Sequence, residues 1–485
     1  MNFLKSKPIY TFLLAAFFCL HGALENFGFI SFVEAMEVFI YVIIAITILF
    51  YIFYFTTKSF LFSGFITFLL AALYLFFEVI KNAVFKIDLF NRYVLFLPLL
   101  ILSLLFIIFL FKKYKWFYKV TFFLNVLLIV YCVLDAGLII KKQMTTQKIV
   151  YQNFVVLNEK LVKHKPNVYL LLFDEYAGLQ SLKDSFNYDN SIFYDQLRND
   201  SFQIINSFSN YSITAFSMSS LFQMNYLNNL QNTTTVGWKE TQQCMLDIKN
   251  APVFIHFKNL GYDVKSFSLF EVLNNKSLGA NQFLLGHQRV LTHKMFHNVF
   301  LKDVGFNFTN GRFASSFFQK LFLADLPAYS TAAERKMLNT VENKTNPQFV
   351  YTHFLMPHYP FLYDSLGNKN ALQTIFKDRA WLVKEDYISY LKYCNKKMVE
   401  MERKIIEKEP GAIIILLSDH GFRYEGSHND KSEFNNFCAV RNLSTSNLHS
   451  TATISNVNLF RYIFNATYKQ SFPYLTDSMV FLKEQ

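Results

Sequence analysis

The sequence lacks the cysteine patterns of a zinc finger or a disulfide-rich extracellular domain. Its 485 residues contain five cysteines, and no two of them form a CxxC pair or have zinc-finger spacing. Cys19 and Cys132 lie within apolar runs, whereas Cys244, Cys394 and Cys438 are widely spaced. One disulfide among these last three is an open alternative, and the odd total leaves at least one thiol unpaired within the chain.

Charged residues are also scarce, at 17% of the chain, and no Lys/Arg-rich tract is interleaved with aromatic residues. The net charge of +12 therefore does not indicate a nucleic-acid partner. Many of the basic residues flank apolar runs. This pattern indicates a membrane protein that carries a mildly basic polar domain.

Phe, Leu, Ile, Val and Tyr dominate the first 140 residues. Five apolar runs of roughly 20 residues each are long enough to cross a hydrocarbon core about 30 Å thick. A cleaved signal peptide is a poor alternative for the first run, because four more runs follow and no clear small-x-small cleavage site is present. The predicted transmembrane helices are 8–24, 38–57, 59–80, 93–111 and 118–140.

The positive-inside rule predicts the orientation of these helices. With the N-terminus inside, the cytoplasmic segments hold most of the lysines near the spans. Five crossings then place everything after about residue 141 outside. The lysines on the predicted inner side are Lys5, Lys7, Lys58, Lys112, Lys113, Lys115 and Lys119.

Acidic residues lie close to the predicted outer ends of the spans. Glu78 and Asp135 are near the ends of their helices, and Glu25, Glu34 and Glu37 follow the first one. Ionisable groups within a membrane protein are often functional. The two interpretations are ordinary interfacial placement and a polar rim that receives a lipid headgroup.

After a polar linker at 141–165, the sequence alternates between short apolar runs and helix-like stretches such as 384–408. The clearest runs are 168–173, 349–354 and 412–417, which suit strands buried on both faces. Strands separated by helices predict a mostly parallel sheet sandwiched by helices over 166–485. Ligands bind beyond the carboxyl ends of such strands.

Acidic residues and a histidine follow two of these strands directly. Asp174 and Glu175 come after the first strand, and Asp419 and His420 follow the third. Together these side chains suit a divalent cation. Zinc is the first expectation for the site, with manganese, calcium or magnesium as alternatives.

A nucleophile is predicted in the hydroxyl-rich segment 210–222, just before an apolar helical run. A hydroxyl at a helix N-terminus lies where backbone N–H groups favour an anion. If it also binds the metal, its pKa falls and it can attack phosphorus or sulfur. The alternative is an ordinary Ser/Thr helix cap.

Three histidines complete the candidate site. His353 and His358 are five residues apart at a predicted strand end, where Pro357 and Pro360 exclude a continuous helix. Such histidines can hold substrate oxygens or protonate a leaving group. His428 follows eight residues after His420 on a polar loop.

In this order the motifs resemble the sulfatase-like branch of the alkaline phosphatase superfamily, over roughly 166–485. The resemblance is closest to membrane-bound phosphoethanolamine transferases and lipoteichoic acid synthases. Thr214-Ala215-Phe216-Ser217 is similar to the transferases' nucleophile segment, which implies Thr214 as the nucleophile and metal ligand, with Ser212 as the alternative. Ser418-Asp419-His420-Gly421 matches the family's metal-binding motif. The resemblance also implies His353, His428 and Ser217 as substrate-binding residues and His358 as a catalytic acid.

Two departures from the transferase pattern are present. The first acidic ligand is Asp174-Glu175, closer to the Asp-Asp of sulfatases, and either or both residues can be the ligand. The loop at Met356–Phe361 is also more like the sulfatase loop. However, the Cys/Ser-x-Pro-x-Arg signature that yields formylglycine is absent, which favours chemistry at phosphorus.

The sequence thus predicts a multi-pass protein of a bacterial inner (cytoplasmic) membrane with a periplasmic or extracellular catalytic domain. Its expected reaction moves a phosphoethanolamine- or phosphoglycerol-like headgroup from a phospholipid donor to an envelope glycan or lipid acceptor. The alternatives are a phosphodiesterase or sulfatase-like hydrolase and a non-catalytic envelope protein. In the segment 223–348, His287 and Arg289 are open candidates for substrate binding, against an ordinary surface role.

Overall fold

The long apolar runs of the first 145 residues form helices, as predicted. The structure, a computed structural model, describes residues 2–114, 116–145, 156–228, 230–279, 287–342, 347–423, 431–443 and 453–484. The chain divides into two units, which are described separately. The helical unit comprises Met1–Tyr151 and Leu285–Arg312, and the α/β unit comprises Gln152–Leu284 and Phe313–Gln485.

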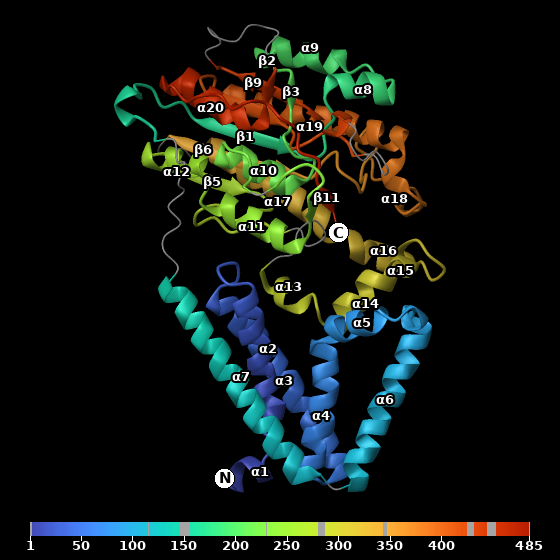
Figure 1. Ribbon diagram of the computed structural model, residues 1–485. Coiled ribbons are helices and arrows are strands. Elements are labelled where there is room, and N and C mark those ends of the chain that lie inside the picture. Colours follow the sequence, from blue (N-terminus) through green and yellow to red (C-terminus); the bar gives the residue numbers. More distant parts are fainter. Residues whose placement is uncertain are drawn as a thin grey trace. The chain divides into compact units, whose positions relative to one another are not determined.

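Helices of the helical unit follow one another with short connections (Figure 1). In the first part of the chain they are α1 (Asn2–Ser6), α2 (Tyr10–Glu25), α3 (Phe32–Thr57), α4 (Phe60–Leu75), α5 (Phe77–Phe85), α6 (Tyr93–Tyr114) and α7 (Phe117–Thr145). The later segment adds α13 (His287–Thr292), α14 (Phe296–Val304) and α15 (Phe306–Thr309).

Three of these helices, α3, α6 and α7, are long and apolar enough to cross a membrane. Helices α4 and α5 pass the same test as a pair but are bent by 71° at their junction, so they count as a fourth span if the pair is one span. Helix α2 is apolar but has 16 residues, which corresponds to about 24 Å. Within the described residues the structure therefore supports three or four of the five predicted spans by length and composition.

A segment that follows β5 (Asp263–Phe267) in the sequence belongs to the helical unit. Leu291 and Met295 join the buried cluster formed by residues of α2, α3 and α4. The Lys294 ammonium lies 2.8 Å from Glu25, and the Lys81 ammonium lies 2.7 Å from Asp303. The sequence predicted one continuous domain over 166–485, whereas these contacts place Leu285–Arg312 with the preceding helices.

Polar partners accompany the acidic residues at the helix ends. Asp135 is buried, and its carboxylate lies 3.1 Å from His21 Nδ1. Glu34 closes a capping box with Ser31 at the start of α3. The carboxylate of Glu78 lies 4.0 Å from His293 Nε2. Asp135, Glu34 and Glu78 therefore each have an ionic or hydrogen-bonded partner within the helical unit.

The α/β unit is built on a six-stranded sheet of order β2-β9-β7-β1-β6-β5. Strands β7, β1, β6 and β5 are parallel, and β9 and β2 add an antiparallel edge. The mostly parallel sheet that the sequence predicted is thus confirmed. The six strands are β1 (Val168–Phe173), β2 (Phe202–Ile204), β5 (Asp263–Phe267), β6 (Gln348–Phe354), β7 (Ile413–Leu417) and β9 (Cys438–Arg441).

Alternate residues of β6 contact helices on opposite faces of the sheet. Phe349 and Tyr351 pack against aromatic rings of α10 (Thr214–Gln223), α12 (Pro252–Asn259) and α20 (Asn456–Tyr468). Gln348 instead donates to the Thr340 carbonyl of α17 (Asp325–Glu342), which packs beside α19 (Lys384–Lys408). Helices therefore cover both faces, and every residue of β1, β6 and β7 is buried because neither face meets solvent.

Smaller elements complete the α/β unit. They are α8 (Leu179–Phe186), α9 (Ser191–Asn199), β3 (Ser207–Phe208), β4 (Thr235–Val236), α11 (Trp238–Lys249), α16 (Ser316–Leu323), α18 (Leu372–Ile375), β8 (Asn435–Asn436), β10 (Ile454–Ser455) and β11 (Lys483–Glu484). All five cysteines of the chain carry free thiols, so the structure does not contain the disulfide left open by the sequence.

Candidate active site

The carboxyl ends of three neighbouring parallel strands bring the predicted acidic residues and histidines together. Strand β1 lies between β6 and β7, and Leu172 is level with both His353 and Leu417. Asp174 follows β1 directly, and its N–H donates to the carbonyl of Phe354 at 3.0 Å. The residues after β1 and β7 therefore meet at one edge of the sheet.

Asp174, Asp419 and His420 form a group that can hold a metal ion. Each offers one ligand atom, and these atoms all lie within 4.8 Å of one another. Asp174 is 1% exposed, and the other two are fully buried. Three of the predicted metal ligands thus converge in a site from which water is largely excluded.

Within the described residues, each carboxylate of this group has one buried oxygen without the partner that a buried anion needs. Asp174 Oδ1 and Asp419 Oδ2 are buried and accept no hydrogen bond from the described part of the chain. Burial, together with the negative charge of Asp419, raises the pKa of Asp174 to about 7. A buried charge without compensation is costly, so a cation suits these two oxygens.

The orientation of His420 supports the same conclusion. Its Nδ1 lies 2.7 Å from the Gly421 carbonyl, so this nitrogen carries the proton and donates it there. Nε2 then presents a lone pair to Asp419 Oδ2 at 3.1 Å. Two lone pairs at this distance repel each other unless a cation or a proton lies between them, so the donor set fits a divalent metal.

Thr214 opens helix α10 beside this group. Ile213 before it is extended, and the helix begins at Thr214, so the first N–H groups of α10 have no acceptor within the helix. The threonine is half-buried, and its Oγ1 lies 3.3 Å from His420 Nε2. The predicted nucleophile is therefore adjacent to the predicted metal ligands, at a helix end that favours anions.

Ser217 lies one turn further along α10 and is fully buried. Its hydroxyl donates to the backbone carbonyl of Asp419 at 2.6 Å, and Asn456 Nδ2 donates to the same carbonyl at 3.1 Å. Ser217 was predicted to bind substrate. Its contacts are those of a residue that positions Asp419.

Glu175 is not part of the three-residue ligand group. Its φ of 61° is uncommon for a residue with a Cβ and directs its N–H to Asp419 Oδ1 at 3.0 Å. Its side chain accepts from the Arg423 N–H at 3.0 Å, and its Oε2 lies 3.6 Å from His358 Nε2. Of the two adjacent acids, Asp174 is therefore the one placed among the candidate ligands.

His353 lies behind Asp174 and is fully buried. Burial lowers the pKa of its imidazole to about 4, so the ring is neutral and carries one proton. Nδ1 lies 3.1 Å from the Tyr351 hydroxyl, and Nε2 lies 3.2 Å from Asp174 Oδ2. The tyrosine donates to Nδ1, and Nε2–H donates to the carboxylate, so these contacts orient Asp174.

His358 is the more accessible member of the predicted histidine pair, with 18% of its side chain exposed. Its Nδ1 donates to the Tyr359 carbonyl, which leaves Nε2 directed toward Glu175 and Arg423. A partly exposed imidazole of this kind suits proton transfer to a leaving group. His428 lies outside the described residues.

Sequence reasoning missed Arg423 in this site and gave no packing reason for Gly421. The guanidinium of Arg423 is partly exposed and lies beside both Glu175 and His358. The sequence signal that could have identified Arg423 was its position two residues after Gly421, the last residue of the Ser418–Gly421 motif. Gly421 itself is required by packing, because a Cβ there would lie 2.5 Å from the carbonyl oxygens of Asn435 and Ser432.

No protein-family model matches the chain, and no curated protein matches it in sequence. Among solved structures, the C-terminal periplasmic domain of EcEptC from Escherichia coli is similar at 11% identity, over 67% of this chain and 91% of that chain, with a TM-score of 0.39. The corresponding domain of the phosphoethanolamine transferase EptC from Campylobacter jejuni has 13% identity, 62% and 89% coverage and a TM-score of 0.35. A putative sulfatase from Bacteroides thetaiotaomicron has 11% identity, 65% and 74% coverage and a TM-score of 0.36. These neighbours are of the two kinds that the motifs resemble.

Proposed function

We propose that this protein is a metal-dependent phosphotransferase that uses Thr214 as its nucleophile. It would move a phospho-headgroup from a phospholipid to an envelope lipid or glycan through a phospho-threonine intermediate. The observation that carries the proposal is the position of the Thr214 hydroxyl, 3.3 Å from His420 Nε2 and beside two buried carboxylates. A hydroxyl held against a cation site at a helix N-terminus suits attack on a phosphate ester.

Asp174, Asp419 and His420 would hold the cation, with Thr214 as a further ligand. When bound, a divalent metal supplies charge neutralisation and lowers the pKa of a coordinated hydroxyl. Zinc suits a site with one imidazole and carboxylates in a closed pocket, and manganese, calcium and magnesium are the alternatives.

The protein groups then have distinct tasks. The Thr214 hydroxyl loses its proton to solvent, and its Oγ1 forms a bond to phosphorus as the bond from phosphorus to the glycerol oxygen breaks. His358, with one proton on Nδ1 and a second proton taken from solvent on Nε2, would protonate the departing diacylglycerol oxygen from Nε2. The guanidinium of Arg423 is placed to pair with a phosphate oxygen. An acceptor hydroxyl or phosphate then attacks the phospho-threonine and restores the free Thr214.

A lipid donor gives the helical unit a role, because such a substrate need not leave the bilayer. The apolar helices support insertion into a membrane. We propose a bacterial inner membrane, five spans, and a catalytic unit on the periplasmic or extracellular side. The motif order and the lysine distribution of the sequence support this arrangement.

The test compares Thr214→Ala with Thr214→Ser in the full chain, reconstituted in vesicles of phosphatidylethanolamine and phosphatidylglycerol. Thr214→Ala should lower diacylglycerol release by a factor on the order of 10⁴ or more, because no other group replaces the attacking oxygen. Thr214→Ser keeps a hydroxyl and should retain measurable activity. Mass spectrometry of the peptide around residue 214 should show a phosphorus-containing adduct in the active forms alone.

Other outcomes have definite meanings. Full activity in Thr214→Ala would refute the mechanism. Release of a free phospho-headgroup with no modified acceptor would identify a phosphodiesterase, and cleavage of an aryl sulfate would identify a sulfatase-like hydrolase. A purified chain with neither bound metal nor adduct would favour the non-catalytic alternative.

A further inference from the structure

Helix α16 of the α/β unit exposes large apolar side chains. Phe317 and Leu321 of this helix are 69% and 63% exposed. Phe313, three residues before the helix, is 64% exposed. Large apolar side chains that gather on one exposed surface mark a contact with a partner or with a membrane. The surface formed by these three residues therefore needs an explanation beyond the fold of the unit.

The helix presents its apolar face on the side away from its own unit. Phe317 and Leu321 are four residues apart and therefore lie on one face of the helix. Leu323 lies nearly opposite Leu321 around the helix, and it is the buried residue of α16. A surface helix of a globular protein normally turns its apolar face toward the core. Packing within the α/β unit thus does not explain the exposed face.

Contacts within the α/β unit fix α16 in place. The Ser315 hydroxyl accepts the N–H of Phe318 and caps the start of the helix. At the other end, α16 packs against α17. The ring of Phe322 lies edge-on to the ring of Phe376, with 5.7 Å between their centroids. A folded and anchored helix, and not a loose segment, therefore holds the apolar face outward.

The charges near α16 are of one sign. No acidic residue occurs in the sequence between Asp303 and Asp325. Arg312 and Lys320 lie within this interval, and both are exposed. A helix with Phe and Leu on one face and basic residues beside that face is typical of a segment that lies in the interface of a membrane with anionic lipids.

The chain also connects α16 closely to the helical unit. Helix α15 belongs to that unit, and α16 follows it along the chain (Figure 1). Seven residues lead from the end of α15 at Thr309 to Ser316, and they can span at most about 25 Å. Just before α15, Asp303 contacts Lys81 of α5 and Tyr93, the first residue of the apolar span α6. Helix α16 is therefore within reach of the membrane surface at which α6 begins.

We propose that α16 is an interfacial helix that inserts Phe317 and Leu321 into the surface of the membrane that the helical unit crosses. Apolar faces of such helices lie about 5–10 Å deep, at the boundary between headgroups and acyl chains. Lys320 and Arg312 then lie at the level of the anionic headgroups. The proposal rests on membrane insertion of the helical unit, and it goes beyond the phosphotransferase reaction.

The same helix is connected to the candidate active site. Phe322 of α16 contacts the ring of Phe376. The carbonyl of the neighbouring Ile375 accepts a hydrogen bond of 2.9 Å from the Tyr359 hydroxyl, and Tyr359 directly follows His358. An α16 fixed at the membrane would thus limit how far the loop of His358 moves from the lipid surface. The catalytic meaning of this link rests on the proposed function, whereas the membrane contact does not.

The experiment measures the accessibility of nitroxide spin labels in the full chain, reconstituted in vesicles of phosphatidylcholine and phosphatidylglycerol. Phe317→Cys and Leu321→Cys place labels on the apolar face. Ser316→Cys is the control on the same helix, and Ile192→Cys is the matched apolar control, because Ile192 is 76% exposed on α9 of the same unit. Oxygen concentrates in the bilayer and a polar nickel chelate stays in water, so the ratio of their effects on relaxation reports depth. The signal of native cysteines is subtracted with the labelled wild-type chain.

The ratio of oxygen to chelate accessibility should be several-fold higher at positions 317 and 321 than at 316 and 192. A second measurement places the label at Phe313→Cys and adds Phe317→Ser and Leu321→Ser. Insertion should then weaken by a factor on the order of 100, because two large apolar side chains no longer leave water, and the label at 313 should become accessible to the chelate. All substituted residues are exposed, so the fold of the unit does not depend on them.

Equal access of the chelate to positions 317, 321 and 192 would overturn the proposal. Exclusion of both reagents at 317 and 321 would also overturn it, because protein would then cover the face, either a second copy or another segment of this chain. Thr214→Ala should keep the accessibility pattern of wild type. The measurement does not use catalysis, so a failure of the phosphotransferase mechanism would leave the interfacial helix in place and remove only the catalytic meaning of its link to His358.

Discussion

Replacing Asp174 with asparagine should stabilise the metal-free protein while abolishing its response to metal. The carboxylate is buried beside Asp419, and its Oδ1 accepts no hydrogen bond from the described residues. An asparagine can still accept from His353 through its carbonyl oxygen. It can turn its NH₂ group toward the position of the orphaned oxygen, and it carries no charge.

The magnitude follows from the raised pKa of Asp174, about 7 in the folded chain against 3.8 for an ordinary aspartate. Between these values the folded state holds more protons than the unfolded state, so stability falls as the pH rises through this window. Above pH 7 the cost in the free energy of unfolding is about 4 kcal/mol, and at pH 5 it is less than half of that. Asp174→Asn removes this cost.

The assay is thermal unfolding of the full chain at pH 5 and pH 8, with a chelator or with excess zinc. In chelator at pH 8, Asp174→Asn should melt several degrees above wild type, and the gain should shrink at pH 5. Saturating metal at about 100 times its Kd should stabilise wild type by about 2.7 kcal/mol and should leave the variant unchanged. Asp195→Asn, at an exposed ion pair with Arg198, is the control and should change stability by less than about 1 kcal/mol.

Two results would refute this reasoning. A variant less stable than wild type in chelator at pH 8 would mean that Asp174 is not an uncompensated buried charge. A metal-induced stabilisation that survives the substitution would mean that Asp174 is not a ligand.

Three further predictions concern Ser217 and Gly421 beside the candidate ligands and the buried Glu402 of α19. Ser217→Ala should cost about 1 kcal/mol of stability and lower turnover several-fold, because the backbone carbonyl of Asp419 loses one hydrogen-bond donor. The control is Ser219→Ala on the same helix, which should keep the turnover of wild type. Gly421→Ala should destabilise by about 1–3 kcal/mol and weaken metal binding in a metal titration, because its Cβ would meet backbone oxygens at 2.5 Å. Glu402→Gln should leave activity unchanged. Burial raises the pKa of Glu402 to about 8, so wild-type stability falls as the pH rises from 5 to 8, and the advantage of the variant in urea unfolding should grow over the same range. A constant difference would contradict this last prediction.

The parts of the site that follow directly from chain direction were predictable from the sequence. Apolar runs that end in acidic residues indicated parallel strands, and parallel strands deliver the residues after them to one edge. Asp174, Asp419 and His420 meet for this reason. The position of Thr214 at the start of a helix followed from the hydroxyl-rich segment before an apolar run.

The roles of neighbouring residues depended on contacts between distant segments and were not predictable. Whether Asp174 or Glu175 joins the ligand group is decided by the backbone turn at Glu175, where φ is 61°. Ser217 is directed to the Asp419 carbonyl by the packing of α10 against the end of β7. No local pattern in the sequence encodes either of these arrangements.

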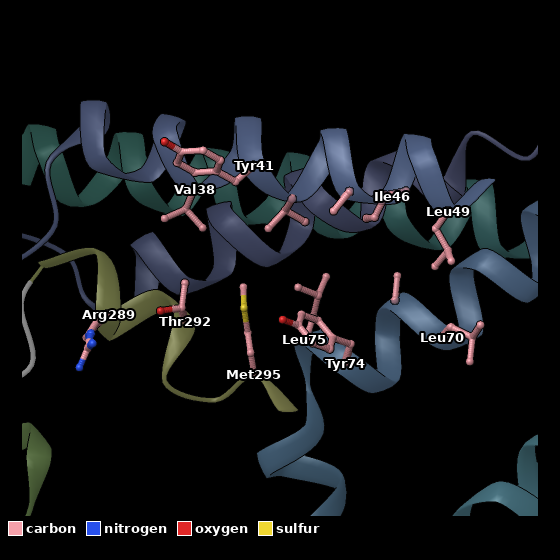
Figure 2. Close-up of a pocket in the computed structure, with 13 residues that line it drawn as sticks. Val38, Tyr41, Ile46, Leu49, Leu70, Tyr74, Leu75, Arg289, Thr292 and Met295 are labelled. Carbon is pink, nitrogen blue, oxygen red and sulfur yellow. The ribbon is translucent and has the colours of Figure 1, made fainter. Parts of the chain in front are cut away.

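That the segment Leu285–Arg312 belongs to the helical unit was not predictable from the sequence for a related reason. Its apolar residues are interrupted by polar ones such as His293, Lys294 and Asp303, so no run is long enough to suggest a membrane span by itself. The partners of Leu291 and Met295 lie more than 200 residues earlier in the chain, in α2, α3 and α4. The sequence left Arg289 open between substrate binding and a surface role; in the structure Arg289 is exposed and lines a cavity with residues of α3 and α4 (Figure 2).

The return of the chain to the helical unit has a consequence for biogenesis. Ribosomes synthesise the chain from its N-terminus. Helices α2 to α7 are therefore made first, and Gln152–Leu284 follows before the segment Leu285–Arg312 exists. Until that point, the buried cluster of α2, α3 and α4 lacks Leu291 and Met295, which complete it in the finished chain. A single protease cut in 146–155 would also fail to release the α/β unit, because the chain crosses to the helical unit again at residue 285.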